Sequence, residues 1–224
     1  MRYVFLLVIP GLLLAIWAQW RMLSVYRRWS QQACATRRLT GAVAAREILD
    51  AAGLSTVAIE STSGYLTDHY DPRARALRLS AEVHDTDSLA AIGIAAHEAG
   101  HALQHQDLYW PIQVRLALLP FTRAAAWLAL PMLAAGLALR VPPFLILGTA
   151  LFMVLMVFQL ISLPLEFDAS RRAGRILIER RLVSSTELDG VGQVLQAAAW
   201  TYVASFTLCF VQMLRWLRFL RLPI

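Results

Sequence analysis

The sequence is short of charge, contains no lysine and has only two cysteines, and each shortage excludes a class of protein. Only 16% of the 224 residues are charged while 58% are hydrophobic, which is too apolar for a soluble domain of this size. Cys34 and Cys209 lie far apart, so we expect no structural disulfides and a reducing compartment. All 21 basic residues are arginine and gather near the ends of apolar stretches. Anionic lipid explains this placement, so we expect no nucleic-acid partner.

Four stretches contain no charged residue: 3–20, 124–139, 141–165 and 190–214. About 20 apolar residues cross the hydrocarbon core of a bilayer, so three of the stretches are long enough as they stand. The stretch 124–139 reaches that length when it is extended back to Leu116 and Arg123 turns toward the interface. Pro142 and Pro143 follow it and predict a tight hairpin to the next span. The chain is therefore predicted to be a mainly α integral membrane protein with about four transmembrane helices.

The first apolar stretch is predicted to be an anchor. It is longer than the apolar region of a secretory signal peptide, and no small-residue cleavage site follows it. We therefore expect residues 1–20 to remain in the protein.

The arginines predict the orientation in the membrane. Only Arg2 precedes the first span, and eleven arginines lie in residues 21–123. The positive-inside rule then places that segment in the cytoplasm, together with the five arginines of residues 166–189. The C-terminal tail is the exception, because Arg215, Arg218 and Arg221 recur among apolar residues. This spacing predicts an amphipathic helix along the interface, and the sequence leaves its side open.

The polar segment after the first span is predicted to form a small α+β domain over residues 21–115. Residues 40–52 have the apolar spacing of a helix, with Gly53 as its stop. Short strands are expected at 56–60 and 75–80, separated by turns. Asp85 to Ser88 supply capping side chains for a further helix over about 89–105.

This last helix contains the most informative motif, His97-Glu-Ala-Gly-His101. On a helix His97 and His101 are one turn apart on one face, so both imidazoles can reach one Zn²⁺ ion. Glu98 lies beside them, placed to take a proton from a water molecule at that ion. The motif thus predicts a zinc site of the peptidase kind.

A third ligand must come from elsewhere in the chain, because catalytic zinc commonly has three protein ligands. His105 would lie about 12 Å from His97 along a straight helix, so it is more readily a second-layer or surface residue. Glu166 and Asp168 end the third span, and ionisable residues at a membrane edge are candidates for function. Asp168 has an alternative as an ion-pair partner of Arg171 or Arg172. The residues alone leave both carboxylates open.

Four segments together carry a resemblance to a known family. They are Leu66-Thr-Asp-His-Tyr-Asp-Pro72, Ala95-Ala-His-Glu-Ala-Gly-His-Ala-Leu-Gln-His105, Pro164-Leu-Glu-Phe-Asp-Ala-Ser-Arg-Arg-Ala173 and Thr201-Tyr-Val-Ala204. In order and spacing the chain resembles the YugP-type membrane zinc metallopeptidases of bacteria, relatives of the HtpX-like gluzincins. The resemblance implies a zincin-like metalloprotease domain with one Zn²⁺ per chain, held by His97, His101 and Glu166, and Glu98 as general base. It departs at Ser170, where HtpX-like enzymes have an aspartate.

The implied protein is a membrane-embedded zinc endopeptidase of the bacterial inner membrane, multi-pass, with its active site facing the cytoplasm. Protein or peptide substrates and the lipid bilayer are the expected partners, and an oligomer or membrane partner proteins are compatible with the sequence. Its predicted divisions are 1–20 anchor, 21–115 catalytic domain, 116–165 transmembrane hairpin, 166–189 cytoplasmic helix with the third ligand, 190–214 transmembrane helix and 215–224 tail. The alternative is a catalytically silent, zinc-stabilised membrane scaffold or adaptor. A metal transporter is less favoured, because the spans contain no ionisable residue.

Hydrolysis also needs a donor for the oxyanion. Tyr65, His69, Tyr70 and Tyr202 are the candidates, and we take His69 and Tyr202 as the predicted catalytic residues beside Glu98. Residues 66–72 either present a strand edge to which an extended substrate adds, or form an Asx turn that closes a hairpin.

Overall fold

The computed structural model describes residues 2–220, which are mainly helical and contain one small sheet. They divide into two compact units. The sheet-containing unit comprises residues 20–109 and 165–199, and the helical unit comprises residues 2–19, 110–164 and 200–220.

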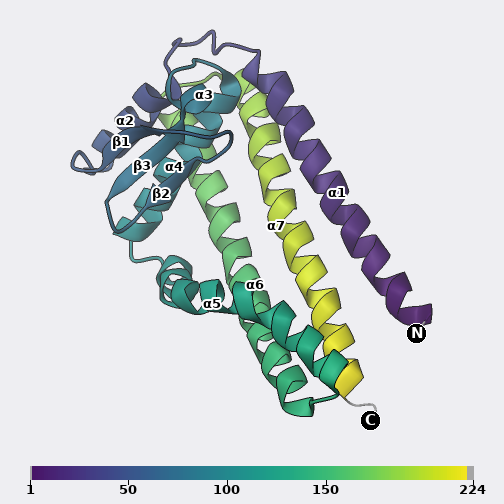
Figure 1. The fold of residues 1–224 in the computed structure, drawn as a ribbon. Coiled ribbons are helices and arrows are strands. Elements are labelled where there is room, and N and C mark those ends of the chain that lie inside the picture. Colours follow the sequence, from purple (N-terminus) through teal and green to yellow (C-terminus); the bar gives the residue numbers. More distant parts are fainter. Residues whose placement is uncertain (1, 221–224) are drawn as a thin grey trace. The chain divides into compact units, whose positions relative to one another are not determined.

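The sheet-containing unit has the predicted α+β composition. It includes the end of α1 (Arg2–Ser30), the C-terminal part of α6 (Pro142–Glu179) and the start of α7 (Ser185–Leu220). Its other elements are α2 (Gly41–Ala51), β1 (Ala58–Thr62), β2 (His69–Asp71), β3 (Ala76–Ser80), α3 (Ala81–His84) and α4 (Leu89–Gln106). Figure 1 shows α4 lying against the sheet, with which it shares contacts at β2 and β3.

The helices predicted at residues 40–52 and about 89–105 form, and local capping explains where they begin, whereas residues 166–189 comprise the end of α6, a turn and the start of α7. The Thr40 side chain accepts a hydrogen bond from the Val43 N–H at the start of α2, and the Ser88 side chain accepts one from the Ala91 N–H at the start of α4. Such caps satisfy backbone donors that have no partner within the helix. Helix α4 therefore starts at Leu89, as predicted, and the motif lies in its middle.

The strands form a sheet of order β1-β3-β2, in which β1 is parallel and β2 antiparallel to β3. Strand β1 begins two residues later than predicted. Residues 66–72 contain both the Asx turn and an edge strand, and the addition of a substrate to that edge stays a prediction. Asp71 Oδ1 accepts hydrogen bonds from the Arg73 and Ala74 N–H groups at 3.0 and 3.1 Å, which closes the hairpin. The residues before it form β2, an edge strand of the described sheet.

The core of this unit is made by one apolar cluster. Its largest fully buried side chains come from α2 (Ile48 and Leu49), β3 (Leu77 and Leu79), α4 (Leu89 and Ile92) and α6 (Leu177). Helix α4 also buries Ala95, Ala96, Ala99 and Ala102. These short side chains allow neighbouring backbone to approach the motif closely.

Glu187, near the start of α7, anchors the segment between α1 and α2. Its carboxylate accepts hydrogen bonds from the Ala35 N–H at 2.6 Å and from the Ser184 N–H at 2.8 Å. Cys34 beside it is fully buried, and both cysteines are free, as the sequence predicts.

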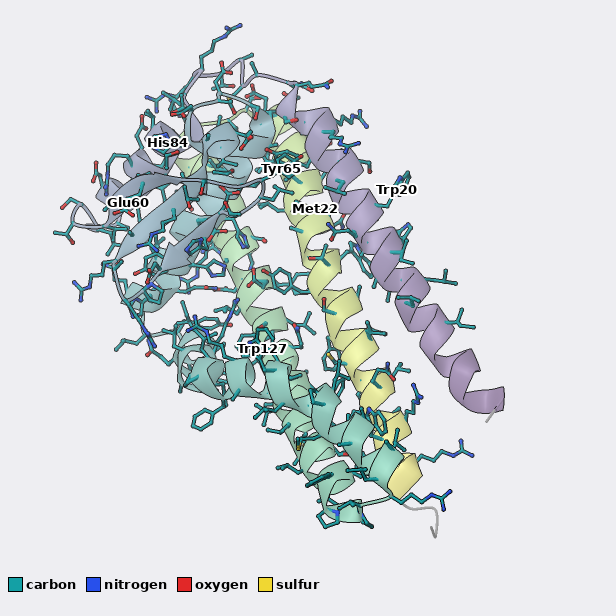
Figure 2. The ribbon with its side chains drawn as sticks, viewed as in Figure 1. Trp20, Met22, Glu60, Tyr65, His84 and Trp127 are labelled. Atoms are coloured by element: carbon teal, nitrogen blue, oxygen red, sulfur yellow. The ribbon has the colours of Figure 1, made fainter. Side chains whose placement is uncertain are left out.

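The helical unit contains the apolar segments: α5 (Trp110–Leu139) and the apolar parts of α1, α6 and α7. Within residues 2–220, three helices are long and apolar enough to cross a membrane, namely α5, α6 and α7 up to Arg218. Trp127 is 82% exposed and projects from α5 (Figure 2), as a side chain facing lipid would. The fourth expected span lies within α1 and stays a prediction.

The turn between α5 and α6 differs in detail from the expected proline hairpin. Arg140, with φ of 56°, and Val141 make the turn, and Pro142 is the first residue of α6. Proline suits a first helical position, because its missing N–H has no helical partner there. At the other end, α7 continues as a helix through Arg215 and Arg218, whereas Arg221 of the predicted tail lies outside the described residues.

Candidate metal centre

The two motif histidines and Glu166 converge within the sheet-containing unit. The ring centroids of His97 and His101 are 4.7 Å apart. Glu166 Oε2 lies 3.1 Å from His97 Nε2 and 3.4 Å from His101 Nε2. One ligand atom from each residue lies within 4.8 Å of the others. The side chains are 13%, 11% and 3% exposed, respectively, so the donors point into a largely enclosed space.

Helix packing brings Glu166 to the histidines. Gly100 faces the Ala169 backbone on α6, and a Cβ atom at position 100 would lie 2.9 Å from the Ala169 carbonyl oxygen. Only glycine permits this approach, since such a contact is shorter than van der Waals distance. Glycine destabilises a helix interior, and at Gly100 this close packing offsets that cost. Glu166 lies just before Ala169 on α6 and therefore reaches α4 at the level of the motif.

The second histidine is oriented by Gln104, a fully buried residue that the sequence reading did not single out. The Gln104 amide nitrogen donates to the Leu165 carbonyl oxygen and to Asp168 Oδ2, both at 2.9 Å. Its oxygen therefore faces His101 Nδ1, also at 2.9 Å, and accepts a hydrogen bond from it. With the proton on Nδ1, the lone pair of His101 Nε2 faces Glu166.

The first histidine has a corresponding partner in Ser170. The Ser170 hydroxyl lies 3.1 Å from His97 Nδ1. Ser170 therefore contacts the ring atom opposite the one that faces Glu166. A hydroxyl that accepts from Nδ1–H leaves His97 Nε2 free to bind an ion.

Asp168 is turned away from the cluster and forms the ion pairs considered as its alternative. Its carboxylate lies 3.0 Å from an Arg171 nitrogen and 2.7 Å from Arg172 Nε. Arg172 also pairs with Asp107, at the C-terminal end of α4. Asp168 therefore links Gln104 of α4 to Arg172 of α6, which in turn pairs with Asp107.

The charges of the cluster act on one another. Burial alone would lower the pKa of His101, but the Glu166 carboxylate, its hydrogen bond and the charge of Glu98 outweigh burial and raise the pKa. A buried anion beside two imidazoles thus favours a cation between them. Two imidazole nitrogens and one carboxylate oxygen, with each imidazole held at its other nitrogen, are a donor set that fits zinc.

Glu98 lies beside this cluster and is held by the sheet. Its Oε2 accepts a hydrogen bond from the Tyr70 backbone N–H on β2 at 3.0 Å. Tyr70 lies opposite Leu77 of β3 in the register. Because the Tyr70 N–H bonds to Glu98, it points away from β3, as in a pair of opposite residues that are not hydrogen-bonded to each other. The strand edge therefore fixes the second glutamate of the site.

The other predicted catalytic residues are placed differently. His69 lies on β2, one residue before Tyr70, and its Nδ1 is 2.8 Å from the Thr67 carbonyl oxygen. Tyr202 lies on α7 in the helical unit, and its role stays a prediction. The Tyr70 hydroxyl is 3.0 Å from His105 Nδ1, so His105 contacts the residue whose backbone N–H bonds to Glu98. Tyr65 packs edge-to-face on Tyr26 at 5.4 Å.

The site combines two histidines of one helix with a glutamate of a second helix, and a further glutamate follows the first histidine. Zinc peptidases have this arrangement. Residues 4–221 match the family described as "Putative neutral zinc metallopeptidase", and the chain belongs to this family. It is 41% identical over 215 residues to the "Putative membrane protease YugP" of Bacillus subtilis (strain 168), covering 96% of this chain and 95% of that protein. The resemblance drawn from the four sequence segments is thereby confirmed. No solved structure matches the chain significantly.

Proposed function

We propose that the protein is an integral-membrane zinc endopeptidase that cleaves membrane or membrane-associated proteins at the cytoplasmic face. The observation that carries the proposal is the convergence of His97, His101 and Glu166 beside Glu98. Membership of a zinc metallopeptidase family supports it. We assign one zinc ion per chain to the three converging residues and the general-base role to Glu98.

The residues divide the chemistry among them. When bound, zinc supplies a Lewis acid that makes water a better nucleophile at neutral pH and polarises the scissile carbonyl. Glu98 accepts the proton of the attacking water at its carboxylate and later passes it to the leaving amine. The hydrogen bond from Tyr70 holds Glu98 Oε2, and Oε1 is the oxygen we assign to the proton transfer. His69 and Tyr202 remain the proposed donors to the oxyanion.

The edge of β2 is the proposed platform for the substrate backbone. It is an edge strand, and the Tyr70 carbonyl points the same way as its N–H, away from β3. Because the Tyr70 N–H is donated to Glu98, the Tyr70 carbonyl is the group left to bond an extended peptide, which would then pass beside Glu98. The strand edge would thus place the scissile bond near the general base.

The proposed topology has four spans, with the amino terminus outside. Three apolar helices and the arginine distribution support it. A cysteine placed at Glu60, an exposed residue of β1 (Figure 2), tests the side of the sheet-containing unit. We expect a membrane-impermeant maleimide to label Glu60→Cys, in a chain with both native cysteines replaced by alanine, only after the inner membrane is opened. Labelling of intact spheroplasts would contradict the cytoplasmic placement.

The decisive experiment for the function uses the full chain, purified in detergent. We expect about one zinc per chain by elemental analysis and casein cleavage that a chelator abolishes and added zinc restores. A zinc-loaded protein without any cleavage would instead support the scaffold alternative.

A further inference from the structure

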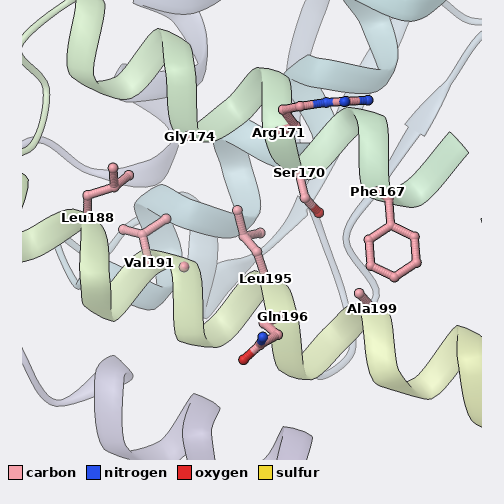
Figure 3. Close-up of a pocket in the computed structure, with 10 residues that line it drawn as sticks. Phe167, Ser170, Arg171, Gly174, Leu188, Val191, Leu195, Gln196 and Ala199 are labelled. Atoms are coloured by element: carbon pink, nitrogen blue, oxygen red, sulfur yellow. The ribbon is translucent and has the colours of Figure 1, made fainter. Parts of the chain in front are cut away.

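His105 is the third histidine of α4 and lies outside the cluster that fits zinc. The three histidines follow one another at intervals of four residues. Each has a hydrogen-bond partner at Nδ1, namely Ser170 for His97, Gln104 for His101 and the Tyr70 hydroxyl for His105. Two of these partners, Ser170 (labelled on α6 in Figure 3) and Gln104, hold imidazoles that face Glu166. The partner of His105 instead belongs to β2, the strand beside the site.

Tyr70 joins β2 to α4 at two points. Its backbone N–H donates to Glu98 Oε2 at 3.0 Å, and its hydroxyl lies 3.0 Å from His105 Nδ1. Glu98 and His105 are seven residues apart, which is two turns along one helix face and about 10 Å along the axis. The Tyr70 ring reaches the His105 ring with their centroids 5.9 Å apart. One residue of β2 therefore contacts both the proposed general base and the third histidine.

The side chains of the other β2 residues bond away from α4. Asp71 pairs with Arg78 of β3 at 3.2 Å, and His69 Nδ1 contacts the Thr67 carbonyl oxygen at 2.8 Å. Strand β2 has three residues and lies at an edge of the described sheet. So short an edge strand has few bonds to hold its position. In the part of the chain that the structure describes, Tyr70 is thus the residue of β2 whose hydrogen bonds fix the strand on α4.

The surroundings of Tyr70 suit this holding role. Its ring packs against the apolar core of the unit. Burial raises the pKa of the Tyr70 hydroxyl, so the hydroxyl keeps its proton at neutral pH and can donate it to the imidazole. A hydroxyl has one proton to donate, and a proton given to His105 is not available to an oxyanion. Tyr70 is therefore better placed to hold the strand than to act as a catalytic donor.

We propose that His105 is a positioning residue: through the Tyr70 side chain it holds the β2 edge where the Tyr70 N–H reaches Glu98, and so it orients the general base. The inference rests on the proposed peptidase function. It gives the third histidine of α4 a role in placing the base and none in binding zinc. It also makes the edge proposed to receive the substrate and the base that serves it move together.

Hydrogen exchange of the Tyr70 amide tests the proposal without turnover. The detergent-purified chain is labelled with ¹⁵N-tyrosine, and the Tyr70 signal is identified by its loss in Tyr70→Phe. We expect exchange at Tyr70 to be at least about tenfold faster in His105→Leu than in the unmodified protein, and close to the rate in Glu98→Ala, which lacks the acceptor. His105 is partly buried near the end of α4 and leucine favours helix, so His105→Leu should fold.

Two further variants separate the hydrogen bond of His105 from general damage to α4. His105→Asn keeps a hydrogen-bonding group near the place of Nδ1 and should restore slow exchange. Gln106→Leu removes a neighbouring hydrogen bond, from α4 to the Ala52 carbonyl, and should leave the Tyr70 amide unchanged. Equal exchange in the unmodified protein and His105→Leu overturns the proposal. Equal exchange in His105→Leu and His105→Asn overturns it as well.

Cleavage and zinc content connect the exchange rates to the function. At equal zinc content, kcat/KM on casein should fall about tenfold or more in His105→Leu and recover in His105→Asn, because a misplaced group slows catalysis steeply. Tyr70→Phe should cause a similar fall, and adding His105→Leu to it should change little more, since both variants remove the same bond. Full cleavage by His105→Leu overturns the proposal, and loss of its zinc does so by making His105 a ligand. If the unmodified protein cleaves nothing but the exchange rates follow the expected order, the peptidase function is contradicted and the positioning of Glu98 is still supported.

Discussion

The Gln104 carboxamide oxygen lies 2.9 Å from His101 Nδ1, on the side of the ring opposite Glu166. The other end of the same amide is bound to Leu165 and Asp168 on α6. The helix that carries Glu166 to the cluster therefore also decides which nitrogen of His101 bears the proton. The contact between α4 and α6 thus sets both the position of Glu166 and the nitrogen of His101 that carries the proton.

Gln104→Leu should weaken zinc binding without removing any ligand. It leaves His101 Nδ1–H without its acceptor, and loss of such outer contacts typically lowers metal affinity about 10–100-fold. Competition with a zinc chelator measures the change. Gln106→Leu is the control, because Gln106 lies on the same helix but its amide bonds to the Ala52 carbonyl. Equal zinc affinity of Gln104→Leu and the unmodified protein would contradict the orienting role.

Ser170→Ala should lower zinc affinity by up to about tenfold, because His97 Nδ1 loses its acceptor. Ser170→Asp supplies a charged and therefore stronger acceptor, so its zinc affinity should exceed that of Ser170→Ala. Ser162→Ala removes another α6 hydroxyl that bonds only to the Phe158 carbonyl in the described contacts, and should change nothing. The order of the three affinities is the measurement.

Glu166→Ala should lose most of its zinc, whereas Asp168→Ala should retain most of it. Glu166 contributes the carboxylate oxygen of the cluster, whereas Asp168 bonds to Gln104, Arg171 and Arg172. Zinc per chain after dialysis, measured by elemental analysis, distinguishes them. Equal zinc occupancy in Glu166→Ala and the unmodified protein would refute the ligand assignment.

Glu98→Gln should lower kcat about 10²–10⁴-fold while zinc content stays unchanged. The glutamine oxygen still accepts the Tyr70 N–H, so the side chain keeps its place but has no basic oxygen. Casein cleavage at matched zinc content checks this. Full cleavage by Glu98→Gln would remove Glu98 from the general-base role.

Asp71 should stabilise the β2–β3 hairpin in a pH-dependent way. Hydrogen bonds from the Ala74 and Arg73 N–H groups, together with the charge of Arg78, outweigh burial and hold the pKa of its carboxyl below the usual value. A lowered folded pKa gives stability that is present above the unfolded pKa of about 3.9 and is lost as the pH falls through the folded value. Asp71→Ala should therefore lower Tm by about 2–4 °C at pH 7, for a loss of about 1 kcal/mol.

The same comparison at a pH below 4 should show the difference shrinking. Asp189→Ala, at an exposed position of α7, is the control and should leave Tm unchanged at both pH values. A constant difference for Asp71→Ala across the range would mean that the carboxylate charge is not the cause.

Sequence reasoning located the motif helix because its signals are local. Ser88 caps α4 and the apolar spacing continues to its end, so the start of the helix was predicted to the residue. Strand β2 was not predicted as a strand, because three residues are too short for an alternating pattern. The edge that holds Glu98 therefore appears only in the structure.

The choice between Glu166 and Asp168 could not be made from their position in the chain. They are two residues apart on α6, which turns them to different sides of the helix. Which side faces α4 is decided by the packing of Gly100 on Ala169. The role of Gln104 also depends on helix packing. Its spacing of three from His101 is visible in the sequence, but its bonds to Leu165 and Asp168 form only in the fold.

The contact between Gly100 and Ala169 has a consequence for how the pentapeptide itself should be read. The two residues between Glu98 and His101 are usually treated as free positions of the pattern. Here the second of them, Gly100, sets the distance between α4 and α6, because even one added methyl group would push α6 outward and carry Glu166 away from the imidazoles. In a chain that builds its site this way, the pattern is better written with glycine fixed before the second histidine, and a larger residue there would signal a different approach of the third ligand.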